Sequence, residues 1–308
     1  MDLEYLQKLG MKQQNKTKVK GDIQMKIGFV GLGLMGKPMS INIIKKSGMP
    51  VMVFDLDKEK TAAVAAEGGE AASSIKEIGE KCDVIVSMVP KSEHVISVYN
   101  ELLPTAEEGK IFIDMSTIDP QVSRELSVKI KEKGAVMIDA PVVKSVPAAE
   151  SGTLGIYVGG CKEAYAKVEN ILKCMGSNII HLGDNGAGLT MKLCHNTLVS
   201  EIQNGVNEMI TLAEKSGINV ENFMTAVSYG GAQNFYLDTK GKVIAERNFK
   251  TAFSVENMNK DVNLTAALVK GLGLNLPGVE VARKVYAEAM ESGYGKEDFS
   301  ATFKVVNK

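Results

Sequence analysis

Two segments of the chain carry residue types that could do chemistry together. The first, Gly28-Phe-Val-Gly-Leu-Gly-Leu-Met-Gly36, contains the spacing Gly-x-Gly-x-x-Gly. The second reads Gly-Leu-Thr-Met-Lys-Leu-Cys-His-Asn and ends at Asn196. Lys192, His195 and Asn196 are spaced i, i+3 and i+4, so on a helix an ammonium, an imidazole and a carboxamide share one face. That face could hold a small polar molecule and exchange a proton with it. The alternatives are a solvated surface lysine and a structural histidine.

The glycine segment predicts a dinucleotide-binding turn, because its context is the required one. A short apolar run, Ile27 to Val30, precedes the turn, and a helical pattern, Pro38 to Ile44, follows it. Gly31 allows the tight turn, Gly33 lets the backbone approach a pyrophosphate, and Gly36 lets helix and strand pack closely. The helix N-terminus adds free N–H groups for the phosphate. We therefore expect the cofactor to contact the whole turn, namely Gly31, Leu32, Gly33, Leu34, Met35 and Gly36.

One acidic residue favours NAD over NADP as that cofactor. Asp55 ends the second predicted strand, about 20 residues past Gly36, where an acid can accept a hydrogen bond from the ribose 2′-hydroxyl. A carboxylate there would repel a 2′-phosphate. No Arg follows nearby, and only Lys58 and Lys60 could compensate. We therefore expect NAD, with NADP as the alternative.

Composition argues against several classes of protein. A net charge of -1 gives no sign of a nucleic-acid or anionic-membrane partner. The four cysteines show no paired spacing and the three histidines form no ligand pattern, so we expect reduced thiols, a cytoplasmic location and no metal site. No apolar run approaches the ~20 residues that span a bilayer. Residues 1–24 are polar and Lys-rich, which predicts a flexible extension and not a secretory signal.

The order of expected elements supplies the scaffold for both segments. Strands alternate with helices, which predicts an α/β fold with a Rossmann-type, doubly wound, mostly parallel sheet over residues 25–187. Ligands of such sheets lie beyond the carboxyl ends of the strands, here the loops after Val89, Asp114 and Asp139. From residue 188 the pattern is helical, which predicts an all-α domain over 188–308 that begins with a long interdomain helix. The expected helices are 188–216, 220–229, 257–270, 278–292 and 296–306.

The ordered set of motifs resembles the β-hydroxyacid dehydrogenase family, which includes 3-hydroxyisobutyrate dehydrogenase, tartronate semialdehyde reductase and, more distantly, 6-phosphogluconate dehydrogenase. The resemblance spans residues 25–308. The segments that carry it are Gly28–Met39, Asp114–Pro120, Asp139–Val142 with Ser151–Leu154, and Gly186–Lys192, supported by Asn259–Asp261 and Asp298–Ala301.

The resemblance implies roles for the matched positions. Lys192 would be the general acid/base, which donates a proton to the nascent alkoxide in reduction and withdraws it in oxidation. Burial and a nearby positive nicotinamide would lower its pKa toward the working pH. Ser116 would hold the substrate hydroxyl or acid group, and Asn196 would hydrogen-bond the substrate. Further cofactor contacts would come from Val89, Pro90, Thr117 and, from the helical domain, Lys260. A plain surface lysine is the alternative for Lys260.

The substrate loop departs from the family pattern. The usual sequence is Asp-Ala-Pro-Val-Ser-Gly-Gly, but here Val143, Lys144 and Ser145 replace its last three residues. This resembles the loop of sulfolactaldehyde reductase, where a cationic side chain helps to hold a sulfonate. The hypothesis is that Lys144 and Ser145, with Val143 beside them, bind a sulfonate, a phosphate or a second carboxylate. The alternative is that Lys144 points to solvent and Ser145 merely replaces glycine.

His195 is the second departure, because 3-hydroxyisobutyrate-type members commonly have Asn there. His followed by Asn is the arrangement of 6-phosphogluconate dehydrogenases, but those use a further acid seven residues past the lysine. That position is Val199 here, so decarboxylation is not expected. His195 could instead add a donor for an anionic substrate group.

Several functions remain possible at this point. The leading one is NAD-dependent interconversion of a short β-hydroxyacid and its semialdehyde. The alternative within enzymes is a reductase for a sulfonated or phosphorylated three-carbon aldehyde. Imine reductases typically lack the lysine, and catalytically silent dinucleotide-binding relatives lose it, so Lys192 argues against both. The expected partners are a small anionic hydroxyacid or aldehyde and, by resemblance, further copies of the chain in a homodimer or homotetramer.

Overall fold

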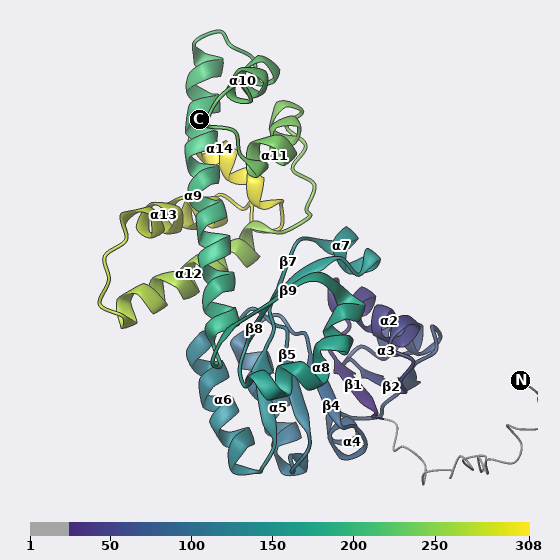
Figure 1. Cartoon of the computed structure of the whole chain (residues 1–308). Helices are drawn as coiled ribbons and strands as arrows, with labels where there is room; N and C mark the ends of the chain where they lie inside the picture. The colour runs from purple at the N-terminus through teal and green to yellow at the C-terminus, as the bar shows by residue number, and fades with distance from the viewer. Residues whose placement is uncertain (1–24) are drawn as a thin grey trace, which may run out of the picture.

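The computed structural model describes residues 25–308, and the prediction for residues 1–24 lies outside them. A sheet flanked by helices forms one end of the molecule and a group of helices forms the other (Figure 1). The long helix α9, Ala187–Lys215, leaves the sheet and runs through the helical part. The predicted helix from residue 188 to 216 is therefore present, and it physically joins the two parts.

Within residues 25–308 the sheet has nine strands. It is mostly parallel, as predicted. The strand order is β3-β2-β1-β4-β5-β6-β8-β7, with β9 paired to β8. Only the pairings of β8 with β6 and β7 are antiparallel. The strands are β1 Ile27–Val30, β2 Val51–Phe54, β3 Glu70–Ala71, β4 Val84–Ser87, β5 Ile111–Asp114, β6 Val136–Asp139, β7 Val142–Val143, β8 Leu154–Gly159 and β9 Gly176–Gly183.

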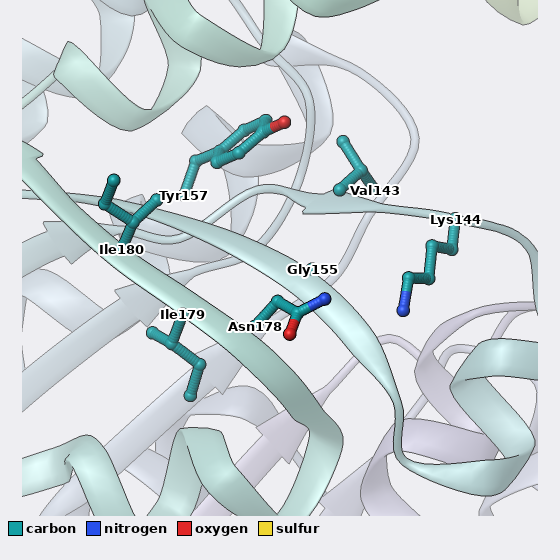
Figure 2. A pocket seen from close by; sticks show the side chains of 7 residues that line it. All are labelled: Val143, Lys144, Gly155, Tyr157, Asn178, Ile179 and Ile180. Carbon is teal, nitrogen blue, oxygen red and sulfur yellow. The ribbon is translucent and has the colours of Figure 1, made fainter. Parts of the chain in front are cut away.

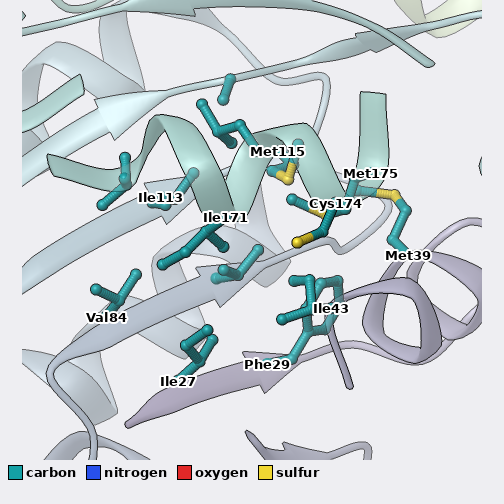
Figure 3. Close-up of a cluster of buried hydrophobic side chains, with 14 of the residues drawn as sticks. Ile27, Phe29, Met39, Ile43, Val84, Ile113, Met115, Ile171, Cys174 and Met175 are labelled. Carbon is teal, nitrogen blue, oxygen red and sulfur yellow. The ribbon is translucent and has the colours of Figure 1, made fainter. Parts of the chain in front are cut away.

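Helices cover both faces of this sheet, and each face has its own apolar cluster beneath the helices. Successive strand residues point to opposite faces. On β4, Val84 and Val86 join the cluster shown in Figure 3, whereas Ile85 joins the cluster on the other face. The layers therefore follow from continuous apolar strands buried on both sides. The covering helices are α2 Gly36–Lys46, α3 Lys58–Ala65, α4 Ile75–Lys81, α5 Ser92–Leu102, α6 Pro120–Glu132, α7 Val146–Ser151 and α8 Lys162–Met175, with a 3-10 turn at Leu103–Thr105.

The helical part packs around a third apolar cluster, to which α9 contributes Val206 and Ile210. The other helices are α10 Val220–Val227, α11 Phe235–Ala245, α12 Val255–Gly271, α13 Pro277–Glu291, the 3-10 turn Phe299–Thr302 and α14 Phe303–Val306. No helix within residues 25–308 has the length and apolarity needed to cross a membrane.

The sequence-based element assignments differ from the structure in two ways. The helices α4, α7 and α11 and the two-residue strands β3 and β7 were not predicted. The helix expected over 296–306 is wrong, because the chain is extended at Asp298 and only the 3-10 turn and α14 follow. The Asp298 carboxylate is buried, pairs with Lys240 and accepts a hydrogen bond from the Ser300 amide. These contacts hold the chain in a cap conformation where a longer helix would have to continue.

Three neighbouring strands end in register at the edge of the sheet where ligands are expected. Ser87 on β4 is paired with Asp114 on β5, and Asp114 is paired with Asp139 on β6. All three side chains are fully buried. The carboxyl ends of these strands therefore place two carboxylates and a hydroxyl in one row, directly beneath the loops that carry the site.

Candidate functional site

The glycine turn has the geometry that each of its glycines was expected to provide. Gly31 has a φ of +95°, which favours glycine, and a side chain there would collide with the carbonyl oxygen of Met88. A side chain at Gly36 would collide with the carbonyl oxygen of Gly31. Apart from its chain neighbours, no heavy atom of residues 25–308 lies within 4 Å of a β-carbon built on Gly33. Because the space beside Gly33 is open, the turn fits the close approach of a pyrophosphate.

Asp55 follows β2 and is held beside the same turn. Its carboxylate accepts hydrogen bonds from the amide of Leu32 at 2.7 Å and from the amide of Asp57 at 2.9 Å. The Leu32 side chain is buried, whereas Leu34 is 84% exposed and Met35 packs partly against the core. The turn therefore offers a ligand mainly backbone N–H groups, with an acid at its edge.

Lys192 is a buried amine near the start of α9. Its Nζ donates to Asn196 Oδ1 at 3.1 Å, and the side chain is 8% exposed. Burial lowers the pKa of Lys192 from its ordinary value of 10.5 to about 8. The negative charge of Asp261 opposes this shift, and the positive charge of Lys260 adds to it. Lys192 is therefore not a solvated surface lysine, and both its charged and its neutral forms are accessible near neutral pH.

The helical part completes this face through α12. Asn196 Nδ2 donates to Asp261 Oδ2 at 2.6 Å. Lys260 Nζ lies 2.9 Å from Asp261 Oδ1 and also donates to the carbonyl oxygen of Thr117, in the loop after β5. A continuous chain of polar contacts thus links Lys192 to a predicted cofactor-flanking loop. Asp261 was not among the predicted site residues, although it ends the motif Asn259-Lys-Asp that supported the resemblance.

His195 is half-buried and faces Tyr157 on β8. The two side chains approach within 3.3 Å, between the Tyr157 hydroxyl and His195 Nδ1. Burial, and secondarily the charge of Lys192, lowers the pKa of His195 below its ordinary 6.5. The ring is therefore neutral at pH 7 and can contribute one directed N–H donor but no positive charge. Tyr157 was also missed, because nothing in the sequence of β8 shows that it lies against α9.

Val143 and Lys144 border a hollow of about 280 Å³ over β7, β8 and β9, whereas Ser145 does not line it. Lys144 is exposed and has a φ of +80°, a conformation that favours the glycine found there in the family pattern. Its ammonium donates to the Thr153 carbonyl oxygen at 2.6 Å. Lys144 and Tyr157 both line this hollow, with Gly155 of β8 between them in Figure 2. Within residues 25–308, no hydrogen bond or ion pair joins Lys144 or Ser145 to the Lys192 face.

Ser116 occupies a different environment from the one expected. Its side chain has no exposed surface. Its hydroxyl donates to Asp114 Oδ1 at 2.7 Å and accepts from the Val89 amide at 2.9 Å. The side chain thus faces the protein interior, and its contact with substrate stays a prediction. Val89 is half-buried and Pro90 exposed, so the loop that Ser116 holds does reach the surface.

The start of α9 is anchored by Asp139, which no motif assignment had singled out as a site residue. Its two carboxylate oxygens accept hydrogen bonds from the amides of Gly186, at 2.7 Å, and Leu189, at 2.8 Å. These are orphan donors of the first helical turn, which a carboxylate satisfies well. Lys192 is therefore carried by a helix whose first turn is fixed to the end of β6.

Comparison with known proteins agrees with this geometry. The family described as the NAD binding domain of 6-phosphogluconate dehydrogenase matches residues 26–183. The family described as NAD-binding of NADP-dependent 3-hydroxyisobutyrate dehydrogenase matches residues 186–306. The chain belongs to the β-hydroxyacid dehydrogenase family.

Relatives of this β-hydroxyacid dehydrogenase match it over nearly their full length. The mitochondrial 3-hydroxyisobutyrate dehydrogenase of Mus musculus is 32% identical, over 92% of this chain and 87% of the relative. The 2-(hydroxymethyl)glutarate dehydrogenase of Eubacterium barkeri is 32% identical, over 91% and 94%. The structure of Mycobacterium tuberculosis 3-hydroxyisobutyrate dehydrogenase with L-serine has a TM-score of 0.87 and 31% identity, over 93% of this chain and all of that one.

The dehydrogenase is thus an NAD(P)-binding oxidoreductase. No group of three or more His, Cys, Asp or Glu residues that could hold a metal ion occurs within residues 25–308. The groups available for chemistry are the Lys192 amine, the carboxamide of Asn196 and the imidazole of His195.

Proposed function

We propose that this dehydrogenase interconverts a short β-hydroxyacid and its semialdehyde with NAD, using Lys192 as general acid/base. The observation that carries the proposal is the buried Lys192 amine, whose pKa is lowered to about 8, in a hydrogen-bonded face next to the cofactor loops. The names of relatives support the substrate class, since 3-hydroxyisobutyrate and 2-(hydroxymethyl)glutarate are both β-hydroxyacids.

The proton chemistry follows from the contacts of Lys192. A bound nicotinamide would supply the acceptor or donor of the two electrons. In oxidation the neutral Lys192 Nζ takes the proton of the substrate hydroxyl, and in reduction the ammonium returns it to the same oxygen. Asn196 Oδ1 accepts from Nζ and so orients the amine. Asn196 Nδ2 carries two protons and gives one to Asp261, which leaves the other for a substrate oxygen.

The choice of NAD over NADP rests on Asp55. Its carboxylate lies at the edge of the glycine turn, bonded to the Leu32 amide. A 2′-phosphate there would face a negative charge, whereas a 2′-hydroxyl can donate a hydrogen bond to it. The other proposed cofactor contacts are the glycine turn, Gly31 to Gly36, and the positions that the family resemblance implies, namely Val89, Pro90, Thr117 and Lys260.

The direct test is NADH oxidation against three- and four-carbon aldehydes that differ only in their acid group: carboxylate, sulfonate, phosphate or none. We expect the carboxylate to give the highest kcat/KM. A preference of about tenfold or more for sulfonate or phosphate, about 1.4 kcal/mol, would instead favour the second candidate, a sulfolactaldehyde reductase-like enzyme. That candidate rests on Lys144, whose exposed ammonium has a single carbonyl partner and could turn toward an anion.

We also propose a cytoplasmic homodimer or homotetramer. Large apolar side chains are exposed on the helical part, with Leu212 on α9 59% exposed and Phe235 at the start of α11 82% exposed. Such exposed apolar surface is typical of protein–protein contacts. The four cysteines are free, as a reducing compartment would keep them. Light scattering on the eluting protein tests the assembly, and a monomer at micromolar concentration would contradict it.

A further inference from the structure

Asp114 is a buried carboxylate that the proposed chemistry does not use. It ends β5, and its pairing partners on the neighbouring strands are Ser87 and Asp139. Its Oδ1 accepts hydrogen bonds from Ser87 Oγ at 2.8 Å, Ser116 Oγ at 2.7 Å and the Ser116 amide at 3.3 Å. Its other oxygen has no hydrogen-bond partner among residues 25–308. Since burying a carboxylate is costly, this concentration of donors on one oxygen calls for an explanation.

The hydroxyl of Ser116 connects this carboxylate to the loop after β4. A hydroxyl has a single proton, and Ser116 gives it to Asp114. Its lone pairs are then left for the Val89 amide, which donates to Ser116 Oγ at 2.9 Å. An ionised carboxylate can only accept, so Asp114 fixes the direction of both hydrogen bonds. Ser116 thereby acts as a link between β5 and Val89.

The loop held in this way lies against the cofactor turn. The Met88 amide donates to the carbonyl oxygen of Val30 at 2.9 Å, and the Met88 carbonyl lies so close to Gly31 that a side chain there would collide with it. Val89, in the loop that follows β4, therefore lies beside Gly31 at the start of the glycine turn. A shift of Val89 would change the space next to the turn without altering the turn's own backbone.

We propose that Asp114 and Ser116 are a positioning pair that sets the Val89–Pro90 loop against the nicotinamide end of the cofactor, without touching the substrate. The proposal rests on the proposed function, because Val89 is a proposed cofactor contact. It gives Ser116 a task that agrees with its complete burial. It also gives the hydroxyl of Ser116 a role inside the protein.

Ser87 provides a matched control. Its hydroxyl donates to the same carboxylate oxygen as Ser116, at nearly the same distance, and it is equally buried. It makes no hydrogen bond to the Val89 loop. Ser87→Ala and Ser116→Ala therefore both remove one hydroxyl donor from Asp114, but only Ser116→Ala cuts the link to Val89.

The experiment measures the dissociation constants of NAD+ and of ADP-ribose, which lacks the nicotinamide, by calorimetric titration. For Ser116→Ala we expect the Kd of NAD+ to rise about fivefold to tenfold, the loss of one hydrogen bond, with the Kd of ADP-ribose changed less than about twofold. For Ser87→Ala we expect both constants within about twofold of the unsubstituted protein. Asp114→Asn keeps the size of the side chain but removes its charge, and it should weaken NAD+ binding selectively as well.

The outcomes separate this proposal from the proposed function. If the unsubstituted protein binds neither ligand, the proposed function fails first. Equal weakening of both ligands by Ser116→Ala would assign Ser116 a general structural role and overturn the positioning pair. Unchanged NAD+ affinity in that variant would overturn it too. If Ser116→Ala does not fold, Asp114→Asn decides: selective loss of NAD+ affinity supports the pair, and loss of both or of neither contradicts it.

Discussion

The glycine turn and the Lys192 face reach their chemistry by opposite routes. The turn is one short stretch of chain, and what it offers is backbone, because Gly33 leaves open space and the Leu32 side chain points into the core. The Lys192 face is assembled from α9, α12 and the loop after β5. Its chemistry depends on a side chain whose acidity is set by burial among distant segments. Cofactor binding at the glycine turn should therefore respond to substitutions within the turn itself. Catalysis at the Lys192 face should also respond to substitutions in segments that are distant in the sequence.

Lys192→Ala should separate catalysis from cofactor binding most clearly. Loss of the general acid/base is expected to lower kcat by about 10²- to 10⁴-fold, while the Kd of NAD+ measured by titration stays close to that of the unsubstituted protein. Lys215→Ala, at the exposed end of the same helix, is the control and should leave kcat unchanged. A normal kcat in Lys192→Ala would remove the lysine from the mechanism.

Asp261→Asn tests whether the face is truly assembled across the two parts. The loss of one charge-assisted hydrogen bond to Asn196 is expected to lower kcat about 10- to 100-fold. The pH profile should move as well. Oxidation needs the neutral amine, so its rate should rise with pH through about 8, the pKa of Lys192. Asp261 raises that pKa, so its removal should shift the rise to lower pH. An unshifted profile would show that Asp261 does not act on Lys192.

Two substitutions in the glycine turn should show that Gly33 serves cofactor binding and that Gly36 serves packing. Gly33→Ala places a methyl in open space, so we expect little change in the free energy of unfolding but a weaker affinity for NAD+, by about tenfold from lost phosphate contacts. Gly36→Ala collides with the Gly31 carbonyl and should lower the free energy of unfolding by about 1–3 kcal/mol. Urea unfolding and NAD+ titration of both variants check this, and matching effects would refute the division.

Lys144→Gly should have the smallest effect, and it should be stabilising. A non-glycine residue at a φ of +80° is strained by about 1 kcal/mol, which glycine relieves. Lys144→Ala keeps the strain and removes the ammonium, so it isolates the charge. Denaturant unfolding measures the first effect, and the KM for aldehydes with and without an acid group measures the second. A KM raised only for charged aldehydes in Lys144→Ala would bring this loop into the substrate site.

The same contrast explains what the sequence could predict. The turn, the parallel strands and the face of Lys192, His195 and Asn196 follow from short-range spacing, and they were predicted correctly as structural features. Asp261 and Tyr157 were missed, because only tertiary packing brings them to α9. Ser116 was assigned to the substrate by resemblance alone, and the complete burial of its side chain is not visible in a local motif. The helix α11 was missed because it follows the glycines at 230 and 231, which interrupt the helical pattern.

Because Asp139 anchors the start of α9, Lys192 and Asp261 differ in their freedom to move. Lys192 follows the sheet, because the first turn of its helix is tied to β6. Asp261 follows α12 and meets Lys192 only through Asn196. A bending of the molecule that drew α12 away would leave the amine in place and strip it of its negative neighbour. Opening would also return the amine to water, and this outweighs the loss of Asp261 because burial is the largest cause of the lowered pKa of Lys192. The open molecule would therefore hold the proton more tightly, so domain motion and proton affinity would be thermodynamically linked.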